Sequence, residues 1–114
     1  MSFSVTTKEL KRVDLVQVGG RVDSATAPQL EQTLQKIIDS GRYNIVVDLM
    51  ETEYMSSAAL RALISAQKQV KHGMRSGDVR IASMPDKIRK AFDLAGFLEL
   101  FQIYDNEAEA VGSF

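Results

Sequence analysis

The sequence has no cysteine, no tryptophan, two prolines and a single histidine in 114 residues. The lack of cysteine excludes disulfide bonds and thiolate metal centres. No apolar run approaches the ~20 residues that a membrane-spanning helix needs. The first residues, MSFSVTTKEL, lack the apolar core of a signal peptide. We therefore expect a cytoplasmic protein that does not insert into a membrane.

An excess of charge of either sign is also missing. Lysine and arginine number 14, aspartate and glutamate number 15, and the net charge is −1. Direct binding to nucleic acid usually requires a basic excess, so this function is not expected. With 45% hydrophobic residues, the composition is typical of globular proteins. A chain of this length is expected to form a single domain over residues 1–114.

Hydrophobic periodicity divides the chain into strands and helices. Two β-branched stretches, FSVTTKEL and VDLVQVGGRV, predict a pair of strands, the second of which should end at Gly19 and Gly20. Three further strands are predicted at 44–49, 78–83 and 98–104, with helical periodicity between them and after the last. The order β-β-α-β-α-β-α-β-α predicts an α/β fold with a small mixed, partly parallel sheet.

Two pairs of residues have the spacing of a capping box, in which a residue at the helix start and one three positions later satisfy each other's backbone N–H groups. Thr26 with Gln29 predicts the start of the first helix, and Asn106 with Glu109 predicts the start of the last. Gly41 follows the last periodic residue of the first helix and is expected to end it.

None of the common catalytic or cofactor motifs is present. The only histidine, His72, would lie roughly 22 Å from Ser56 if both belong to one helix, so no serine has a base within reach. Asp48, Glu51 and Glu53 are close in sequence, but without histidine or cysteine they are expected to form a solvated acidic turn rather than a metal site. No glycine-rich phosphate loop occurs. We therefore predict no enzyme activity, no metal and no cofactor.

The segment YMSSAAL places two adjacent serines between an apolar strand and a helix. Ser56 is well suited to cap the helix, because its hydroxyl can accept a hydrogen bond from a backbone N–H of the first turn. The cap requires only one serine, so Ser57 is expected at the first helical position with its hydroxyl near solvent. A phosphate there suits a helix N-terminus and adds ~1.5–2 negative charges to a surface that would include Asp23. The pair therefore suggests a phosphorylation-controlled binding switch.

The helix after the serines carries basic side chains and no acidic one. Arg61, Lys68 and Lys71 lie along it. Basic residues near a helix C-terminus interact favourably with the helix dipole, so a solvated face explains them. Docking against an acidic partner is the alternative, and the sequence leaves both interpretations open.

The ordered set of motifs resembles the STAS domain family, and within it the stand-alone bacterial anti-sigma factor antagonists. The resemblance covers nearly the whole chain and is carried by GGRVDSATAPQL, NIVVDL, YMSSAAL and AGFLELFQIYDNEAEAV. The family's usual junction between strand and helix reads M-D-S-[SA]-G-L. Met55, Ser57, Ala58 and Leu60 match this pattern, with Ser57 at the position of the phosphorylated serine.

This resemblance implies a small sheet with helices mostly on one face and a first strand that is antiparallel to the second. It also implies an anti-sigma factor antagonist that, when unphosphorylated, binds an anti-sigma factor that is also a serine kinase. Phosphorylation of Ser57 would release this partner, and a PP2C-type phosphatase would restore binding. The partner surface would comprise Asp23, Ser56, Ser57, Ala58 and Arg61, with Ser56 as the second choice of phosphate acceptor.

Two departures from the family's junction keep other functions open. Ser56 replaces the usual aspartate and Ala59 the usual glycine, and both changes lie where a kinase would bind. A constitutive STAS interaction subunit of a transport or stress-sensing complex is therefore the main alternative. A nucleotide-binding or small-molecule-binding module is the third. The oligomeric state is expected to be a monomer or a weak dimer.

Overall fold

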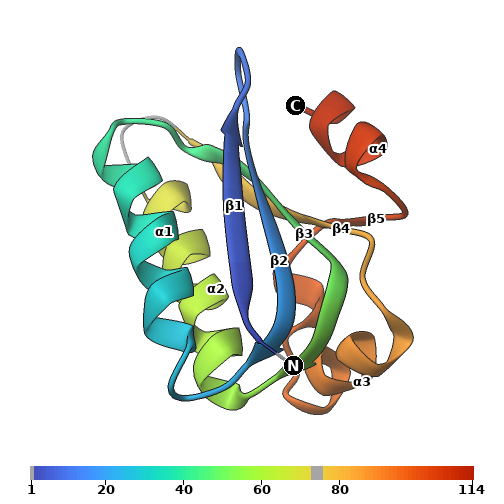
Figure 1. Cartoon of the computed structure of the whole chain (residues 1–114). Helices are drawn as coiled ribbons and strands as arrows, with labels where there is room; N and C mark the ends of the chain where they lie inside the picture. The colour runs from blue at the N-terminus through green and yellow to red at the C-terminus, as the bar shows by residue number, and fades with distance from the viewer. Residues whose placement is uncertain (1, 73–75) are drawn as a thin grey trace.

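The computed structural model describes residues 2–72 and 76–114, and these include a five-stranded sheet with the order β1-β2-β3-β4-β5 (Figure 1). The strands are β1 Ser4–Glu9, β2 Asp14–Val22, β3 Asn44–Met55, β4 Asp78–Ala82 and β5 Ile103–Tyr104. β1 pairs antiparallel with β2, and the other neighbouring pairs are parallel. The predicted mixed, partly parallel sheet with an antiparallel first strand is thereby confirmed.

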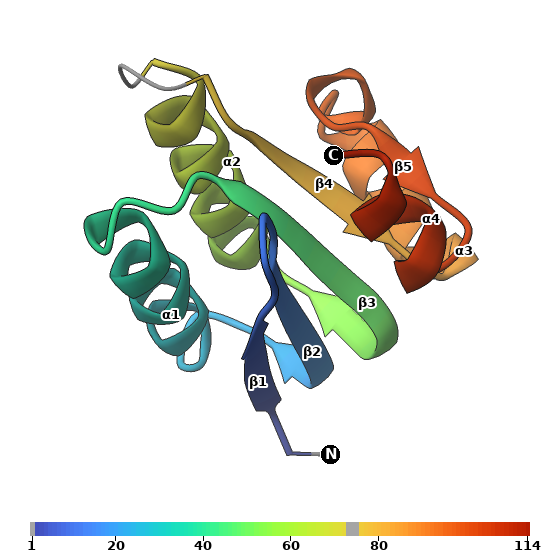
Figure 2. The same cartoon turned by 90° about the horizontal axis from the view of Figure 1, so that it is seen from above.

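Most of the helices cover one face of this sheet. They are α1 Ala27–Asp39, α2 Ser57–Lys71, α3 Asp86–Leu94, the short 3₁₀ helix η1 Leu98–Leu100 and α4 Glu107–Gly112. α1 and α2 lie side by side on one face, and α4 lies on the other (Figure 2). Ile88 and Phe92 of α3 join the core beneath α1 and α2. Among the described residues, none of the helices has the length and apolar character needed to cross a membrane.

The alternation of side chains along β3 separates the two faces. Ile45, Val47 and Leu49 point to the face covered by α1 and α2, where they are fully buried. Val46 points the other way and packs beneath Ala110 of α4, as the period of two in a strand requires. The larger apolar cluster lies on the face with α1 and α2, and each fully buried Leu, Ile or Val there stabilises the fold by about 1.5–3 kcal/mol.

The prediction that the second strand ends at its two glycines is wrong. β2 continues to Val22, and its register with β3 shifts between Gln17 and Gly19 and again between Gly20 and Arg21. Gly20 has φ +78°, and a Cβ at this position would overlap the carbonyl oxygen of Ser2. These glycines therefore permit an irregular, strongly bent strand and a close backbone approach, rather than a strand end.

The last predicted strand is much shorter than residues 98–104. Only Ile103 and Tyr104 pair with β4, whereas Leu98–Leu100 forms a 3₁₀ turn. Leu98 and Phe101 both pack on the core, and the Phe101 ring meets Phe92 edge-on at a centroid distance of 5.9 Å. Two core-facing positions three residues apart, of which Leu98 is partly buried and Phe101 buried, have the spacing of a helical turn, which explains why strand pairing begins only after Phe101.

The predicted caps are only partly correct. At α4 the Glu109 N–H donates to Asn106 Oδ1 at 2.9 Å, as expected, while Asn106 Nδ2 donates to the Glu109 carboxylate at 2.9 Å. At α1, Thr26 occupies the cap position but its side chain makes no capping bond, so the predicted capping box is wrong. α1 ends as predicted, with Gly41 at φ +89°.

Candidate functional site at the start of helix α2

Ser56 caps α2, as its sequence position predicted. Its backbone is extended, with φ −77° and ψ 171°, and its Oγ accepts the Ala59 N–H at 3.3 Å. The Ser56 N–H donates to the carbonyl of Val22 at 2.8 Å, which ties the helix start to the end of β2. The Ser56 hydroxyl therefore provides the helix cap by itself, and the cap does not require Ser57.

Ser57 is the first residue of α2, and its side chain is exposed. Within residues 2–72 and 76–114, its hydroxyl makes no hydrogen bond to the protein. No acidic residue lies in the first turn of α2, so the positive end of the helix dipole is not neutralised by a side chain. This arrangement leaves the Ser57 hydroxyl accessible to an enzyme and places any phosphate on it where a helix tolerates negative charge.

Asp23 shapes the loop that precedes α1. Its Oδ1 accepts the N–H groups of Ala25 at 3.0 Å and Thr26 at 3.1 Å, and Thr26 Oγ1 accepts the Asp23 N–H at 2.9 Å. The hydrogen bonds from the Thr26 and Ala25 backbone lower the pKa of Asp23. Asp23 therefore closes the loop, in place of the capping box predicted at Thr26. The same interactions keep the Asp23 carboxylate ionised at this end of the molecule.

The parallel pairing of β2 and β3 brings these segments together. Val22 and Met55 are partners in the register, so the Asp23 loop and the serine pair both leave the same edge of the sheet. Ala58 is half-buried just behind Ser57, and Arg61 is exposed one turn further along α2. The five residues selected from the sequence therefore all lie at or near the N-terminal end of α2.

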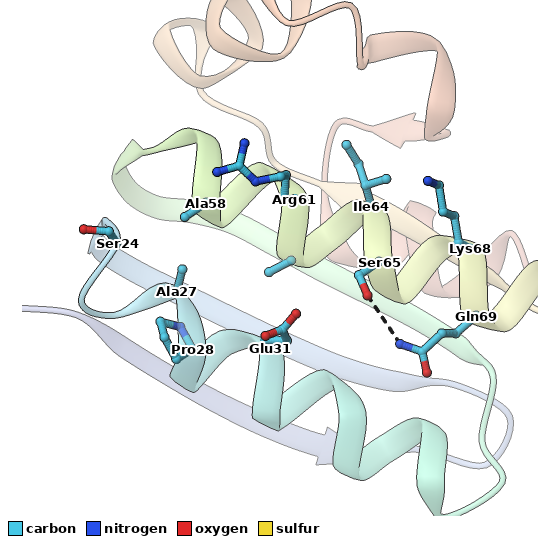
Figure 3. A pocket seen from close by; sticks show the side chains of 11 residues that line it. Ser24, Ala27, Pro28, Glu31, Ala58, Arg61, Ile64, Ser65, Lys68 and Gln69 are labelled. Atoms are coloured by element: carbon cyan, nitrogen blue, oxygen red, sulfur yellow. Dashed lines mark hydrogen bonds between the residues drawn. The ribbon is translucent and has the colours of Figure 1, made fainter.

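A groove of about 630 Å³ runs between α1 and α2 from this end. Figure 3 shows Ala58, Ser65 and Gln69 pointing from α2 toward α1, while Arg61 and Lys68 stand along the outer edge of α2. From the opposite side, Glu31 of α1 rises toward the groove. The candidate site is therefore continuous with a concave surface.

Catalysis and metal binding receive no support from the geometry. His72 is the C-terminal cap of α2 and Ser57 its first residue, so the 15-residue helix separates them by roughly 22 Å. Among residues 2–72 and 76–114, no group of three or more histidine, aspartate or glutamate side chains could hold a metal ion. The arrangement suits binding and modification of an exposed hydroxyl.

Sequence reasoning misplaced the acidic segment. Asp48, Glu51 and Glu53 do not form a solvated turn, because β3 extends through all three to Met55. Asp48 is only 5% exposed and belongs to the sheet face that α4 covers. The continuous apolar run that contains Asp48 was the available signal, since a strand buried on both faces also buries its polar members.

Asp48 and Glu107 form a carboxyl pair that the sequence did not reveal. Burial raises the pKa of Asp48 to about 6, and hydrogen bonding to Glu107 contributes to the rise. The pKa of Glu107 is lowered by its hydrogen bonds with Asp48 and then Gln17, whose Nε2 donates at 2.7 Å. When the pair carries one proton, the raised pKa of Asp48 and the lowered pKa of Glu107 place that proton on Asp48, and the pair joins β3 to the first turn of α4.

The fold and the serine at the helix start together define a small α/β binding domain. The chain matches the model of the STAS domain over residues 4–110, and it belongs to that family. The Bordetella bronchiseptica protein BtrV, a candidate anti-sigma factor antagonist, is 33% identical over 95 residues, which cover 83% of this chain and 80% of BtrV.

Solved structures agree with this assignment. An anti-sigma factor antagonist from Mycobacterium paratuberculosis is 25% identical with a TM-score of 0.86, over 98% of this chain and 93% of that one. SpoIIAA of Bacillus, an anti-sigma factor antagonist, has been solved unphosphorylated and phosphorylated. The unphosphorylated form shares the fold with a TM-score of 0.76 at 13% identity, over 96% of this chain and 96% of SpoIIAA. The phosphorylated form gives a TM-score of 0.77 at 15% identity, over 96% of this chain and 98% of SpoIIAA.

Proposed function

We propose that the chain is an anti-sigma factor antagonist whose binding is switched by phosphorylation of Ser57. In the unphosphorylated state it binds an anti-sigma factor that is also a serine kinase, and so frees the sigma factor. The kinase then phosphorylates Ser57 and is released, and a PP2C-type phosphatase restores the binding form. The chain itself is a binding protein and catalyses no step.

One observation carries this proposal: the hydroxyl of Ser57 is exposed and has no hydrogen-bond partner among residues 2–72 and 76–114, whereas the hydroxyl of Ser56 accepts the Ala59 N–H in the cap. Only Ser57 can therefore accept a phosphate without loss of a helix-capping bond. The similarity to antagonists from Bordetella bronchiseptica and Mycobacterium paratuberculosis supports the partner class, and SpoIIAA is a protein of the same fold with a phosphorylated form.

The release step follows from charge. A phosphate on Ser57 adds ~1.5–2 negative charges to an edge of the sheet where Asp23 already carries an ionised carboxylate. The helix start accommodates this charge without refolding. A partner surface that fits the neutral hydroxyl must instead desolvate the phosphate or face it with like charge, and both weaken the complex.

The acceptor is tested by incubation of the chain with its candidate serine kinase and ATP, followed by mass spectrometric mapping. We expect a single phosphate on Ser57, its loss in Ser57→Ala, and its retention in Ser56→Ala as the matched control. Phosphate on Ser56 or elsewhere would contradict the assignment of Ser57. Tight binding to the partner without any phosphorylation would identify a constitutive interaction subunit instead.

A further inference from the structure

The groove between α1 and α2 has a floor of short side chains. Ala27 and Pro28 of α1 and Ala58 and Ala62 of α2 line it, and none of these side chains extends far from its backbone. The distance to which a third helix can approach depends on the side chains at the contact, and small residues permit the closest packing. The floor is therefore suited to a helix rather than to a bulky isolated side chain.

The edge of the groove formed by α2 is basic. Arg61, Ile64 and Lys68 follow one another along its outer edge (Figure 3), at intervals of three and four residues that align them on one side of the helix. Arg61 and Lys68 are exposed, and within the described part of the chain neither takes part in an ion pair. α2 contains no acidic residue that would neutralise them.

The groove has a defined length and one open end. It extends from Ala58 to Gln69, which is about 16 Å or three helical turns. Near Gln69 the two helices are joined by a reciprocal amide pair, in which Gln35 donates to Gln69 at 3.0 Å and Gln69 donates to Gln35 at 2.9 Å. The other end is lined by Ser24 and Ala58, and Ala58 directly follows Ser57 in α2.

We propose that this groove receives one amphipathic helix of the serine kinase partner, with acidic residues seven positions apart facing Arg61 and Lys68 and small apolar residues against the floor. Residues seven apart on either helix are separated by about 10.5 Å, so the two charge pairs form in register. The inference rests on the proposed function, because the same partner must reach Ser57.

The position of the groove also explains how a phosphate on Ser57 would release the partner. An acidic helix in the groove passes the open end beside Ser57, so phosphorylation places ~1.5–2 negative charges next to a segment that is itself negative. Like-charge juxtaposition across an interface is strongly unfavourable. Release then requires no rearrangement of the fold, only repulsion of the docked helix.

The first test compares two double charge reversals of equal net charge. Arg61→Glu with Lys68→Glu alters the groove, whereas Lys36→Glu with Lys90→Glu alters exposed cations of α1 and α3 that do not line it. Calorimetry with the kinase should show a loss of affinity on the order of tenfold or more for the groove variant and little change for the control.

The outcomes separate this inference from the proposed function. Equal affinity of the groove variant and the unmodified chain, with Ser57 still phosphorylated, would overturn the groove and leave the switch intact. Failure of the unmodified chain to bind any serine kinase would overturn both. Equal losses of affinity in the two double variants would show that only net charge matters, and they would also contradict docking in the groove.

A second test replaces the kinase with a defined probe. An 18-residue designed amphipathic peptide with glutamates seven residues apart is titrated into the isotope-labelled chain, and a twin with lysines at those positions serves as the control. We expect amide chemical-shift changes at Ala58, Ala62 and Ser65 with the glutamate peptide only. Equal response to both peptides, changes on the sheet face beneath α4, or line broadening of the chain alone from self-association through this groove would overturn the proposal.

Discussion

The two faces of the sheet differ in how they are held together. The face under α1, α2 and α3 is mainly apolar, and its largest buried side chains include Phe92, Leu30 and Leu63. Its buried polar contact lies near the C-terminal end of α2, where Gln67 donates to Asp78 at 2.8 Å. The face under α4 has a small apolar cluster around Val46 and a polar network in which Gln17 and Asp48 meet the first turn of α4. The stability of the first face depends on apolar packing. The stability of the second depends also on the protonation of the pair formed by Asp48 and Glu107.

This difference bears on function because α2 belongs to the apolar face. Six apolar residues of α2 are buried, and four of them, Ala59, Leu60, Ala62 and Leu63, lie near its N-terminal end. That end is therefore fixed by apolar packing. A phosphate on Ser57 is therefore expected to change the surface and leave the helix in place. The face under α4 should be the one that responds to pH, and three changes test this contrast.

The largest effect is expected from Phe92→Ala. Phe92 is fully buried and contacts the Phe101 ring, so its removal leaves a cavity and should lower the free energy of unfolding by about 3–5 kcal/mol. The matched control is Leu94→Ala on the same helix, because Leu94 is 90% exposed and its loss should change stability by less than about 0.5 kcal/mol. Urea unfolding of both variants measures the difference; a loss below about 1 kcal/mol for Phe92→Ala would contradict the account of this face.

A smaller, pH-dependent effect is expected from Asp48. Its pKa is raised from 3.8 to about 6, so its stabilising contribution is complete below the unfolded value and is lost as pH rises through about 6. The lowered pKa of Glu107 acts in the opposite sense, and its contribution is lost only as pH falls below its ordinary value of 4.5. Between pH 4.5 and about 7, the pair should therefore lose stability on the order of 1–2 kcal/mol.

Asp48→Asn removes this dependence, because the asparagine amide donates a hydrogen bond to Glu107 at any pH in that range. Relative to the unmodified chain, the variant should gain stability as pH rises from 4.5 to about 7, as measured by urea unfolding at each pH. Glu51→Gln is the control, since Glu51 lies in the same strand and is exposed. Parallel pH profiles for Asp48→Asn and the unmodified chain would show that no proton is shared at this site.

The smallest effect is expected at the two serines. Ser56→Ala removes the bond to the Ala59 N–H and should cost about 1 kcal/mol of stability. Ser57→Ala removes an exposed hydroxyl that bonds to none of the described residues, and it should change stability by less than about 0.5 kcal/mol. Thermal unfolding of the two variants compares them directly. Equal losses would contradict the division of roles between cap and acceptor.

The sequence was sufficient to predict the order of the strands and helices and the position of the serine pair at a helix start, because both depend on local patterns. Leu30 and Leu34 lie on one face of α1 by helical periodicity, and the Ser56 cap depends only on its neighbours. The partner of Asp48 could not be found in this way, since Glu107 of α4 lies more than fifty residues later in the chain. The same holds for Gly20, whose conformation is required by the approach of Ser2.

The proposed partner site was only partly predictable from the sequence. Asp23, Ser57 and Arg61 were selected from local motifs, but the groove beside them arises from the packing of α1 against α2. The Gln35 and Gln69 pair that closes it joins residues 34 positions apart, and no local pattern marks either glutamine. Sequence reasoning therefore found the proposed phosphate acceptor more readily than the surface around it.

The most direct test of the central claim compares the chain before and after phosphorylation at Ser57. Calorimetry with the serine kinase partner gives the affinity, and thermal unfolding of the same two samples gives the stability. We predict that the phosphorylated chain loses partner affinity on the order of a hundredfold, a typical size for coupled switches, while its unfolding free energy changes by less than about 1 kcal/mol. Unchanged affinity, or a loss of affinity accompanied by unfolding of α2, would contradict a switch that acts through surface charge.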